Sequence, residues 1–209
     1  MEDVITILKN VKAIITDTHV VYTSGKHGSV YINKDALYPH TKEAAKVGKL
    51  FAEKYQDSGV EVVVAPALGG IILSQWTAYY LSELTGREVL GVYTEKDADK
   101  NQVFTRGYGS LVKGKKVLVI EDLTTTGGSV KKVVDTVRAA GGEVIGVCTM
   151  VNRDPEHVTS ETIGAPLDQL GIFKAEAWDE AECELCKKGV PVNTEIGHGK
   201  KFISKTSRP

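Results

Sequence analysis

The hydrophobic positions of this 209-residue chain fall into two alternating patterns. Short unbroken apolar runs are typical of strands that are covered on both faces, and apolar residues at helical spacing are typical of helices packed on one side. The runs lie near residues 62–65, 89–92, 117–120 and 144–151, and the helical patterns near residues 41–56, 71–85 and 129–140. This alternation predicts an α/β fold with a doubly wound, mainly parallel sheet.

The same elements predict one domain over residues 1–209, with a core at about 39–154. The segments at about 1–38 and 155–209 lie outside this core, and we expect them to form a small hood. The helix predicted over residues 71–85 carries several aromatic side chains and is apolar on nearly all sides. Such a helix is either deeply buried or part of a subunit interface.

The composition narrows the class of protein. With 42% hydrophobic residues, the 209-residue chain can bury one substantial core. Its net charge of −1 differs from the excess of basic residues that is typical of proteins that bind nucleic acids. No apolar run approaches the ~18 residues of a membrane span, and no signal-like segment precedes the first helix. We therefore expect a cytoplasmic protein that binds neither nucleic acid nor membrane.

Residues 117–130 are the part of the chain that is richest in chemistry. Glu121 and Asp122 follow an apolar run, and ligands of open α/β sheets bind beyond the carboxyl ends of strands. A loop of hydroxyl residues and glycines, Thr124–Ser129, then leads into a helix. Helix N-termini bind phosphate through free N–H groups and the helix dipole, so this loop is a candidate phosphate site. The alternative is a capped turn with two solvated acids.

This segment differs from the common nucleotide-binding loops. Neither the P-loop pattern GxxxxGK[ST] nor the dinucleotide pattern GxGxxG is present in it. Two carboxylates precede the loop instead, which suits vicinal hydroxyls or Mg²⁺ beside a phosphorylated sugar. The segment therefore predicts a site for a phosphorylated sugar.

With its apolar strand, two acids and Thr/Gly-rich loop, segment 117–130 resembles the phosphoribosyl pyrophosphate (PRPP) motif of type I phosphoribosyltransferases. The resemblance implies the fold of that family, with Mg²⁺ as a cofactor held mainly by PRPP, so we predict no metal ligands in the chain. It implies that Glu121 and Asp122 bind the ribose hydroxyls and that Asp122 is also catalytic. The implied 5-phosphate site consists of Thr124, Thr125, Thr126, Gly127, Gly128 and Ser129.

Three further segments are similar to orotate phosphoribosyltransferases. Residues 23–34 read TSGKHGSVYINK, like the segment that lies over the base in those enzymes. Residues 65–71, APALGGI, resemble their pyrophosphate loop, and residues 151–153, VNR, match an arginine beside the orotate carboxylate. The resemblance implies PRPP binding by Ala67, Leu68 and Gly69, with a cis Ala67–Leu68 peptide. It implies base binding by Lys26, Tyr31, Thr125 and Arg153.

The chemistry of these residues agrees, although each has a simpler explanation. Orotate is a planar anion, and arginine pairs with a carboxylate through two hydrogen bonds. Lys26 is otherwise a solvated loop lysine, and Arg153 is otherwise a partner of Asp154 or Glu156. Gly69-Gly70 is otherwise a tight turn without a ligand.

Residues 95–110 are polar and match the position of a mobile loop in orotate enzymes. We expect this segment to close over the site and exclude water. Many of those enzymes carry Arg-Lys-x-x-Lys-x-His-Gly there, whereas this chain has Glu95 for the arginine and lacks the histidine, which is similar to a second branch of orotate-type enzymes. The candidate catalytic or pyrophosphate-binding cations are Lys96, Lys100 and Arg106. Exposed charges in a flexible loop are the alternative.

The chain has three cysteines. Cys148 lies in an apolar run, and we expect it in the core. Cys183-x-x-Cys186 is compatible with half a zinc site or a redox pair, with His198 as a third ligand, but one cysteine pair is too few for a closed site. We expect a thiol pair in a turn, and a similar tail occurs in the second branch of orotate-type enzymes.

Taken together, the resemblance implies an enzyme that transfers the phosphoribosyl group of PRPP to orotate, giving orotidine 5′-phosphate and pyrophosphate for pyrimidine synthesis. A phosphoribosyltransferase for a purine or another base is an alternative, as is a PRPP-binding regulator without catalysis. Because related enzymes are dimers with shared sites, the resemblance favours a homodimer with the helix over residues 71–85 at its interface.

Overall fold

The computed structural model describes residues 2–206 and divides into two compact units. The first, the sheet unit, comprises the described residues up to Val11 together with Lys34–Phe173. The second, the small unit, comprises Lys12–Asn33 and the described residues from Lys174 onward.

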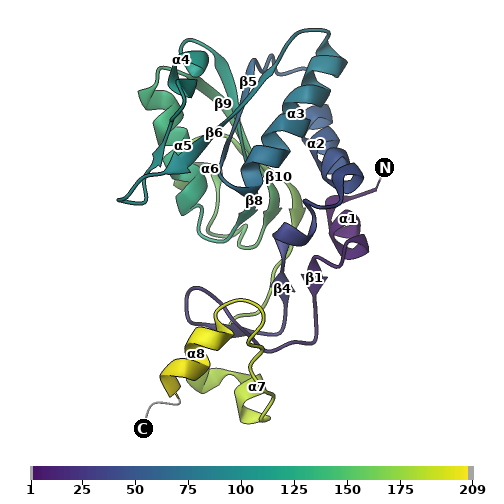
Figure 1. The fold of residues 1–209 in the computed structure, drawn as a ribbon, viewed down its shortest axis with the longest axis vertical. Coiled ribbons are helices and arrows are strands. Elements are labelled where there is room, and N and C mark those ends of the chain that lie inside the picture. The colour runs from purple at the N-terminus through teal and green to yellow at the C-terminus, as the bar shows by residue number, and fades with distance from the viewer. Residues whose placement is uncertain (1, 207–209) are drawn as a thin grey trace. The chain divides into compact units, whose positions relative to one another are not determined.

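A six-stranded sheet forms the centre of the sheet unit (Figure 1). Its strand order is β10-β9-β8-β5-β6-β7, and every neighbouring pair is parallel except β6 and β7. The strands are β5 (Val62–Pro66), β6 (Leu90–Lys96), β7 (Gln102–Val103), β8 (Lys116–Thr124), β9 (Glu143–Asn152) and β10 (Leu167–Ile172). The predicted α/β fold with a mainly parallel sheet is confirmed, and each predicted strand is found.

Helices cover both faces of this sheet. Figure 1 shows α2 and α3 on one side of the strands and α5 on the other. The helices of the unit are α1 (Val4–Asn10), the short 3₁₀ helix η1 (Lys34–Ala36), α2 (Thr41–Tyr55), α3 (Gly69–Thr85), α4 (Tyr108–Val112), α5 (Gly128–Ala139) and α6 (Ser160–Ile163). Within residues 2–206, none of the helices combines the length and the hydropathy that crossing a bilayer requires.

A cluster of buried valines holds α5 against the sheet. The helical spacing of Val130, Val133, Val134 and Val137 predicts one apolar face, and all four side chains are at most 1% exposed. They pack against valines of β5, β8 and β9. Each such side chain contributes about 1.5 kcal/mol or more through removal from water. This packing fixes the position of the loop that precedes α5.

The helix α3 carries three aromatic side chains, of which Trp76 and Tyr80 are half-buried and Tyr79 is exposed. Gly48 of α2 allows close packing, because a Cβ there would lie 2.4 Å from the Cβ of Trp76. Tyr79 is 52% exposed and contacts Trp76 and Tyr80 edge to face, with ring centroids 6.0 Å and 5.3 Å apart. The helix is therefore buried on one side and leaves an aromatic patch on the surface of the described chain.

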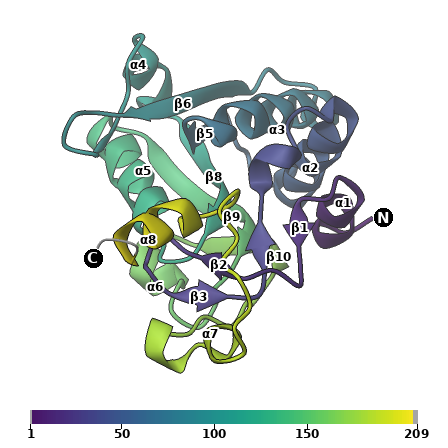
Figure 2. The same ribbon diagram turned by 60° about the horizontal axis from the view of Figure 1, so that its bottom comes forward.

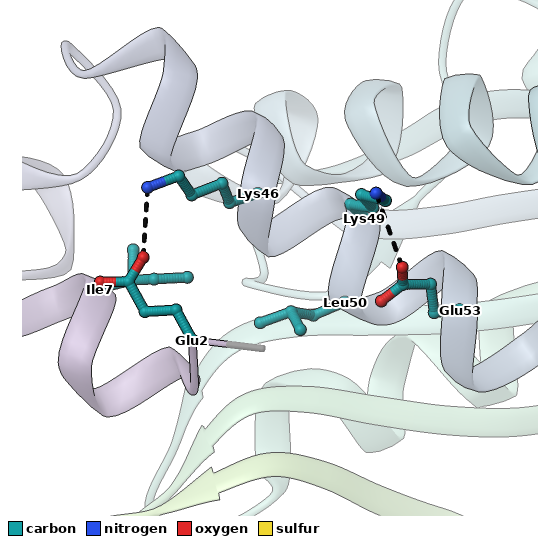
Figure 3. A pocket seen from close by; sticks show the side chains of 6 residues that line it. All are labelled: Glu2, Ile7, Lys46, Lys49, Leu50 and Glu53. Carbon is teal, nitrogen blue, oxygen red and sulfur yellow. Dashed lines mark hydrogen bonds and ion pairs between the residues drawn. The ribbon is translucent and has the colours of Figure 1, made fainter.

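The helix α1 belongs to the sheet unit. Its first turn is capped by Asp3, whose carboxylate accepts hydrogen bonds from the N–H groups of Ile5 (2.9 Å) and Thr6 (3.0 Å). Lys46 of α2 pairs with Glu2 at 3.1 Å, beside a pocket of about 240 Å³ (Figure 3). The pocket is lined by Glu2, Ile7, Lys46, Lys49, Leu50 and Glu53, so none of the predicted site residues lies in it.

The observed units have different boundaries from the predicted core at 39–154 and hood at 1–38 and 155–209. At the N-terminus the sheet unit includes α1 and also residues 34–38, which were predicted to belong to the hood. At the C-terminal boundary, a capping box of Thr159 and Thr162 begins α6, and the chain then returns as β10 beside β9. The sheet unit therefore continues to Phe173.

The small unit consists of short elements (Figure 2). Its two antiparallel pairs join β1 (Ile14–Ile15) to β4 (Tyr31–Ile32) and β2 (Val20–Val21) to β3 (His27–Gly28). The C-terminal part contributes η2 (Glu180–Glu182), α7 (Glu184–Lys187) and α8 (Gly199–Thr206). The backbone of His27 connects the two parts, since its N–H donates to the carbonyl of Trp178 (2.8 Å) and its carbonyl accepts from Trp178 N–H (2.9 Å).

Candidate active site

Two helix N-termini meet the carboxyl edge of the sheet. β5 leads into α3, and β8 leads into α5 (Figure 2). The residue before each helix makes no side-chain cap bond, so no cap side chain occupies the first N–H groups of either helix. A hollow of about 220 Å³ lies at this edge, and its lining includes Gly69, Lys96, Glu121, Asp122 and Ser129.

Asp122 is the most constrained side chain in this hollow. It is 5% exposed, and its Oδ2 accepts a hydrogen bond from the hydroxyl of Tyr38 (2.8 Å) and pairs with Lys34 Nζ (3.0 Å). Its Oδ1 accepts from the N–H of Leu123 (2.6 Å). Burial alone would lower the pKa of Lys34, but the charge of Asp122 and hydrogen bonds to Asp122 and Asp35 outweigh it and raise that pKa. Asp122 is therefore a fixed carboxylate.

Glu121 is buried beside Asp122, and this environment shifts its pKa. Its carboxylate oxygen accepts a hydrogen bond from the N–H of Asp122 at 3.0 Å. Burial raises the pKa of Glu121 well above its ordinary value, and the charge of Asp122 raises it further. Burial beside a second acid thus disfavours the charged form of Glu121. Both lie within β8, which continues to Thr124, so the strand ends later than the apolar run predicts.

The predicted phosphate loop lies where β8 turns into α5. Thr124 is buried, and its hydroxyl accepts a hydrogen bond from the N–H of Gly127 (3.1 Å), which shapes the loop. Gly127 has a φ of 74°, a left-handed conformation that suits glycine. The exposed residues of the segment are Thr125, Thr126, Gly128 and Ser129. Their phosphate-binding role stays a prediction.

The loop between β5 and α3 approaches Asp122 closely. The Ala67–Leu68 peptide is cis, as the resemblance predicts, and Leu68 is 83% exposed. A Cβ on Gly69 would lie 2.3 Å from both Asp122 Oδ2 and the hydroxyl of Tyr38. Only glycine fits here, and its N–H lies at the start of α3 beside the two acids.

Lys96 is the predicted catalytic cation that lines the hollow. It is the last residue of β6 and is exposed. β6 and β7 form a hairpin in which Lys96 is opposite Gln102, and Gln102 accepts a hydrogen bond from the hydroxyl of Thr94 at 2.7 Å. Gln102 is itself part of the lining.

Lys100 and Arg106 lie outside the lining of the hollow. Lys100 is exposed in the hairpin turn, where its carbonyl accepts from Lys132 Nζ of α5 at 2.8 Å. Arg106 pairs with Glu95 at 3.4 Å, and Glu95 also accepts from the hydroxyl of Thr105. The segment expected to be a lid is thus a hairpin bonded to α5 in this structure, and its catalytic role stays a prediction.

The predicted base-binding residues are divided between the two units. Lys26 is exposed in the small unit and lies 3.8 Å from Asp179, and Tyr31 is half-buried in β4. In the sheet unit, Arg153 directly follows β9 and its N–H donates to the carbonyl of Thr124 (2.9 Å), next to Thr125. The assembly of these residues around one base stays a prediction.

Sequence reasoning missed two residues that fix the central carboxylate. Tyr38 is 84 positions from Asp122 along the chain, and no motif marks it. Lys34 is the last residue of the segment that resembles the base-covering region, and this position was the only sequence signal that Lys34 belongs to the site. Together the arrangement offers helix N-termini for anions, a buried carboxylate for hydroxyls, and lysines that offset negative charge.

Comparison with known proteins agrees with this geometry. The family model described as phosphoribosyl transferase domain matches residues 33–162. An orotate phosphoribosyltransferase of Caldanaerobacter subterraneus subsp. tengcongensis is 35% identical over 86% of this chain and 88% of its own. One of Desulforamulus reducens is 34% identical over 91% and 93%.

A solved structure shows the same fold. The crystal structure of Mycobacterium tuberculosis H37Rv orotate phosphoribosyltransferase in complex with PRPP is 26% identical, with a TM-score of 0.61, over 82% of this chain and 96% of that chain. The chain therefore belongs to the type I phosphoribosyltransferase family, and the relatives named here are orotate phosphoribosyltransferases.

Proposed function

We propose that this protein transfers the phosphoribosyl group of PRPP to orotate, forming orotidine 5′-phosphate and releasing pyrophosphate. The observation that carries the proposal is Asp122, a buried carboxylate held by Lys34 and Tyr38 between the N-termini of α3 and α5. Orotate as the acceptor is supported by the relatives that are named for that base, and PRPP as the donor by the Mycobacterium enzyme, whose structure contains it.

PRPP has a phosphate at one end of its ribose and a pyrophosphate at the other. The hollow has a helix N-terminus for each of these anionic groups and two acids for the ribose. The 5-phosphate binds the exposed loop residues before α5, and the pyrophosphate binds the N-terminus of α3 at Gly69. Asp122 and Glu121, between these two helix starts, bind the ribose hydroxyls. The buried acids accept these hydrogen bonds without needing to move.

Catalysis then depends on charge. Loss of pyrophosphate leaves positive charge on the ribose, which the carboxylate of Asp122 stabilises, and negative charge on the leaving group, which Lys96 offsets. The hollow is rich in oxygen donors and so fits Mg²⁺, but Asp122 is already paired with Lys34, so PRPP oxygens are the main ligands. Mg²⁺ bound there would neutralise charge on the pyrophosphate.

The acceptor is a planar anion and needs groups beyond the hollow. In the sheet unit, Arg153 binds its carboxylate and Thr125 lies beside the ring.

The protein acts as a homodimer. The aromatic patch on α3, exposed Tyr79 beside half-buried Trp76 and Tyr80, supports this proposal, because aromatic side chains are enriched at interfaces.

A substrate panel tests the proposed function. The protein is incubated with PRPP, Mg²⁺ and either orotate, uracil, adenine, guanine or hypoxanthine, while base absorbance and pyrophosphate release are followed. We expect orotate to be consumed in step with pyrophosphate release. Consumption of a purine with orotate unchanged would refute the acceptor. Binding of PRPP in calorimetry without turnover of any base would indicate a regulator instead.

A pair of variants tests the site. Asp122→Asn removes the buried charge, and we expect PRPP affinity to fall roughly tenfold to a hundredfold, the range for a hydrogen bond to a charged group. Asp135→Asn is the matched control, since Asp135 is exposed on α5 and pairs with Lys131 at 3.0 Å. Equal PRPP affinity in the two variants would contradict the assignment of Asp122.

A further inference from the structure

Four potential metal ligands gather in the small unit, outside the proposed PRPP site. The Nε2 atom of His19, the Nδ1 atom of His27 and the two sulfurs of Cys183 and Cys186 all lie within 4.8 Å of one another. The first three residues are buried and Cys186 is half-buried. The cluster joins segments that are 164 positions apart in the chain.

The local structure aims these atoms at one point. His27 lies in β3, Cys183 is the N-cap residue of α7, and Cys186 lies within this short helix. His19 Nδ1 lies 2.7 Å from the carbonyl oxygen of Val190. A carbonyl only accepts hydrogen bonds, so Nδ1 carries the proton and Nε2 presents a lone pair to the cluster. A partner of this kind behind the ring is what orients metal-binding histidines in proteins.

The spacing fits a tetrahedral ion. Zn–S bonds of about 2.3 Å and Zn–N bonds of about 2.0–2.1 Å place a sulfur and a nitrogen about 3.6 Å apart, and two nitrogens about 3.4 Å apart. The observed sulfur–nitrogen separations are 3.6 Å from Cys183 to His19, 3.7 Å from Cys186 to His19 and 3.3 Å from Cys186 to His27. The two nitrogens are 2.9 Å apart, closer than this separation, so they would move apart when the ion binds.

We propose that His19, His27, Cys183 and Cys186 bind one zinc ion in a closed site that stabilises the small unit. Two sulfurs with two imidazole nitrogens in tetrahedral arrangement favour zinc over the hard cations, which prefer oxygen. Each thiol loses its proton on binding, so the two thiolates balance the charge of the ion. With four protein ligands the site keeps no open position for a substrate, which makes its role structural.

The small unit needs such a stabilising element. Among its described residues the fully or nearly buried hydrophobic side chains are Ala13, Val20, Val21, Tyr22, Ile32 and Cys183. So few apolar groups stabilise a small unit poorly, and structural metals commonly supply the difference. Zinc would link His19, directly before β2, and His27 in β3 to the cysteines of the α7 segment. His27 is also the residue that follows Lys26 in the sequence.

The structure also corrects the ligand considered from sequence. His198 is not in the cluster, and its Nε2 lies 3.3 Å from the hydroxyl of Thr23. The cysteine pair lies at the start of the short helix α7 and not in a turn, and the missing half of the site comes from two histidines near the N-terminus.

Metal analysis of the full-length protein, produced with zinc in the medium, tests the proposal. Mass spectrometry of total metal is expected to find about one zinc per chain. Cys148→Ala and His198→Gln are matched controls that keep the zinc, whereas Cys186→Ala and His19→Gln lower it at least tenfold. Wild-type protein without zinc after incubation with zinc sulfate would overturn the proposal. So would undiminished zinc in Cys186→Ala, or an intact mass that shows a Cys183–Cys186 disulfide.

A second measurement does not depend on whether the variants fold. Wild-type protein is stripped with a chelator under reducing conditions and titrated with Co²⁺. We expect the intense visible bands of tetrahedral cobalt and a near-ultraviolet thiolate-to-cobalt band, both abolished by added Zn²⁺. A weak octahedral spectrum without the thiolate band would rule out this ligand set.

Discussion

The glycine before α5 tests whether the shape of its loop is what binds phosphate. Gly127 has a φ of 74°, and a Cβ there would lie 2.6 Å from Cδ1 of Ile163, a buried member of the valine cluster. The left-handed conformation costs an L-residue about 1–2 kcal/mol. Displacing Ile163 from its rotamer costs about 1 kcal/mol more. We therefore expect Gly127→Ala to lower the free energy of unfolding by about 2–3 kcal/mol.

Gly141, just beyond the other end of α5, provides the control. Its φ is 84°, but the nearest atom to an added Cβ is Lys113 Cγ at 3.4 Å, so Gly141→Ala carries the backbone cost alone, about 1–2 kcal/mol. Urea denaturation measures both stabilities, and titration calorimetry measures PRPP affinity. Gly127→Ala should weaken PRPP binding roughly tenfold or more because the N–H groups at the helix start move, while Gly141→Ala leaves it unchanged. Equal stability losses with PRPP affinity intact in both variants would refute the reasoning.

Three further changes test other parts of the site. Tyr38→Phe removes a 2.8 Å hydrogen bond to buried Asp122, and calorimetry should show roughly tenfold weaker PRPP binding; unchanged affinity would mean that Lys34 alone fixes the carboxylate. Lys96→Ala should lower kcat roughly tenfold or more in steady-state assays, whereas Lys100→Ala, outside the hollow, should stay near wild type; the reverse order would contradict our reading of the hairpin. Tyr79→Glu places a charge in the exposed aromatic patch and should give monomers in light scattering, unless the dimer uses another surface.

The fold was largely predictable because its central strands are buried on both faces. Such strands read as unbroken valine and isoleucine runs, and their starts agree closely with the structure. The ends of β6 and β8 do not agree, because both strands continue past their apolar runs, and β8 includes Glu121 and Asp122, polar residues that a hydrophobic pattern places outside a strand. β10 was missed for a related reason. It is an edge strand whose first five positions are only half-buried, so its sequence LDQLGI shows no continuous apolar run.

The residues of the candidate site are of two kinds: those that are neighbours in the sequence, and those that only the fold brings together. The acids, the phosphate loop and its helix are contiguous, so their order alone indicates a phosphorylated sugar. Tyr38 and Lys34 approach Asp122 only through the fold. The sequence pattern contains nothing that links a tyrosine before α2 to a carboxylate in β8.

The cysteine pair shows how the same limit changes a chemical conclusion. Read locally, Cys183 and Cys186 supply two ligands, and a closed zinc site needs four. His27 lay inside the segment that resembles the base-covering region, so a base-binding role already accounted for its neighbourhood, and His19 stands in no motif. The His19 side chain is only 2% exposed, but this is informative only together with the burial of His27 and Cys183. Removing a histidine from water costs free energy that a hydrogen bond or a metal must offset. Four such groups within 4.8 Å of one another indicate a shared ligand more strongly than any of them does alone.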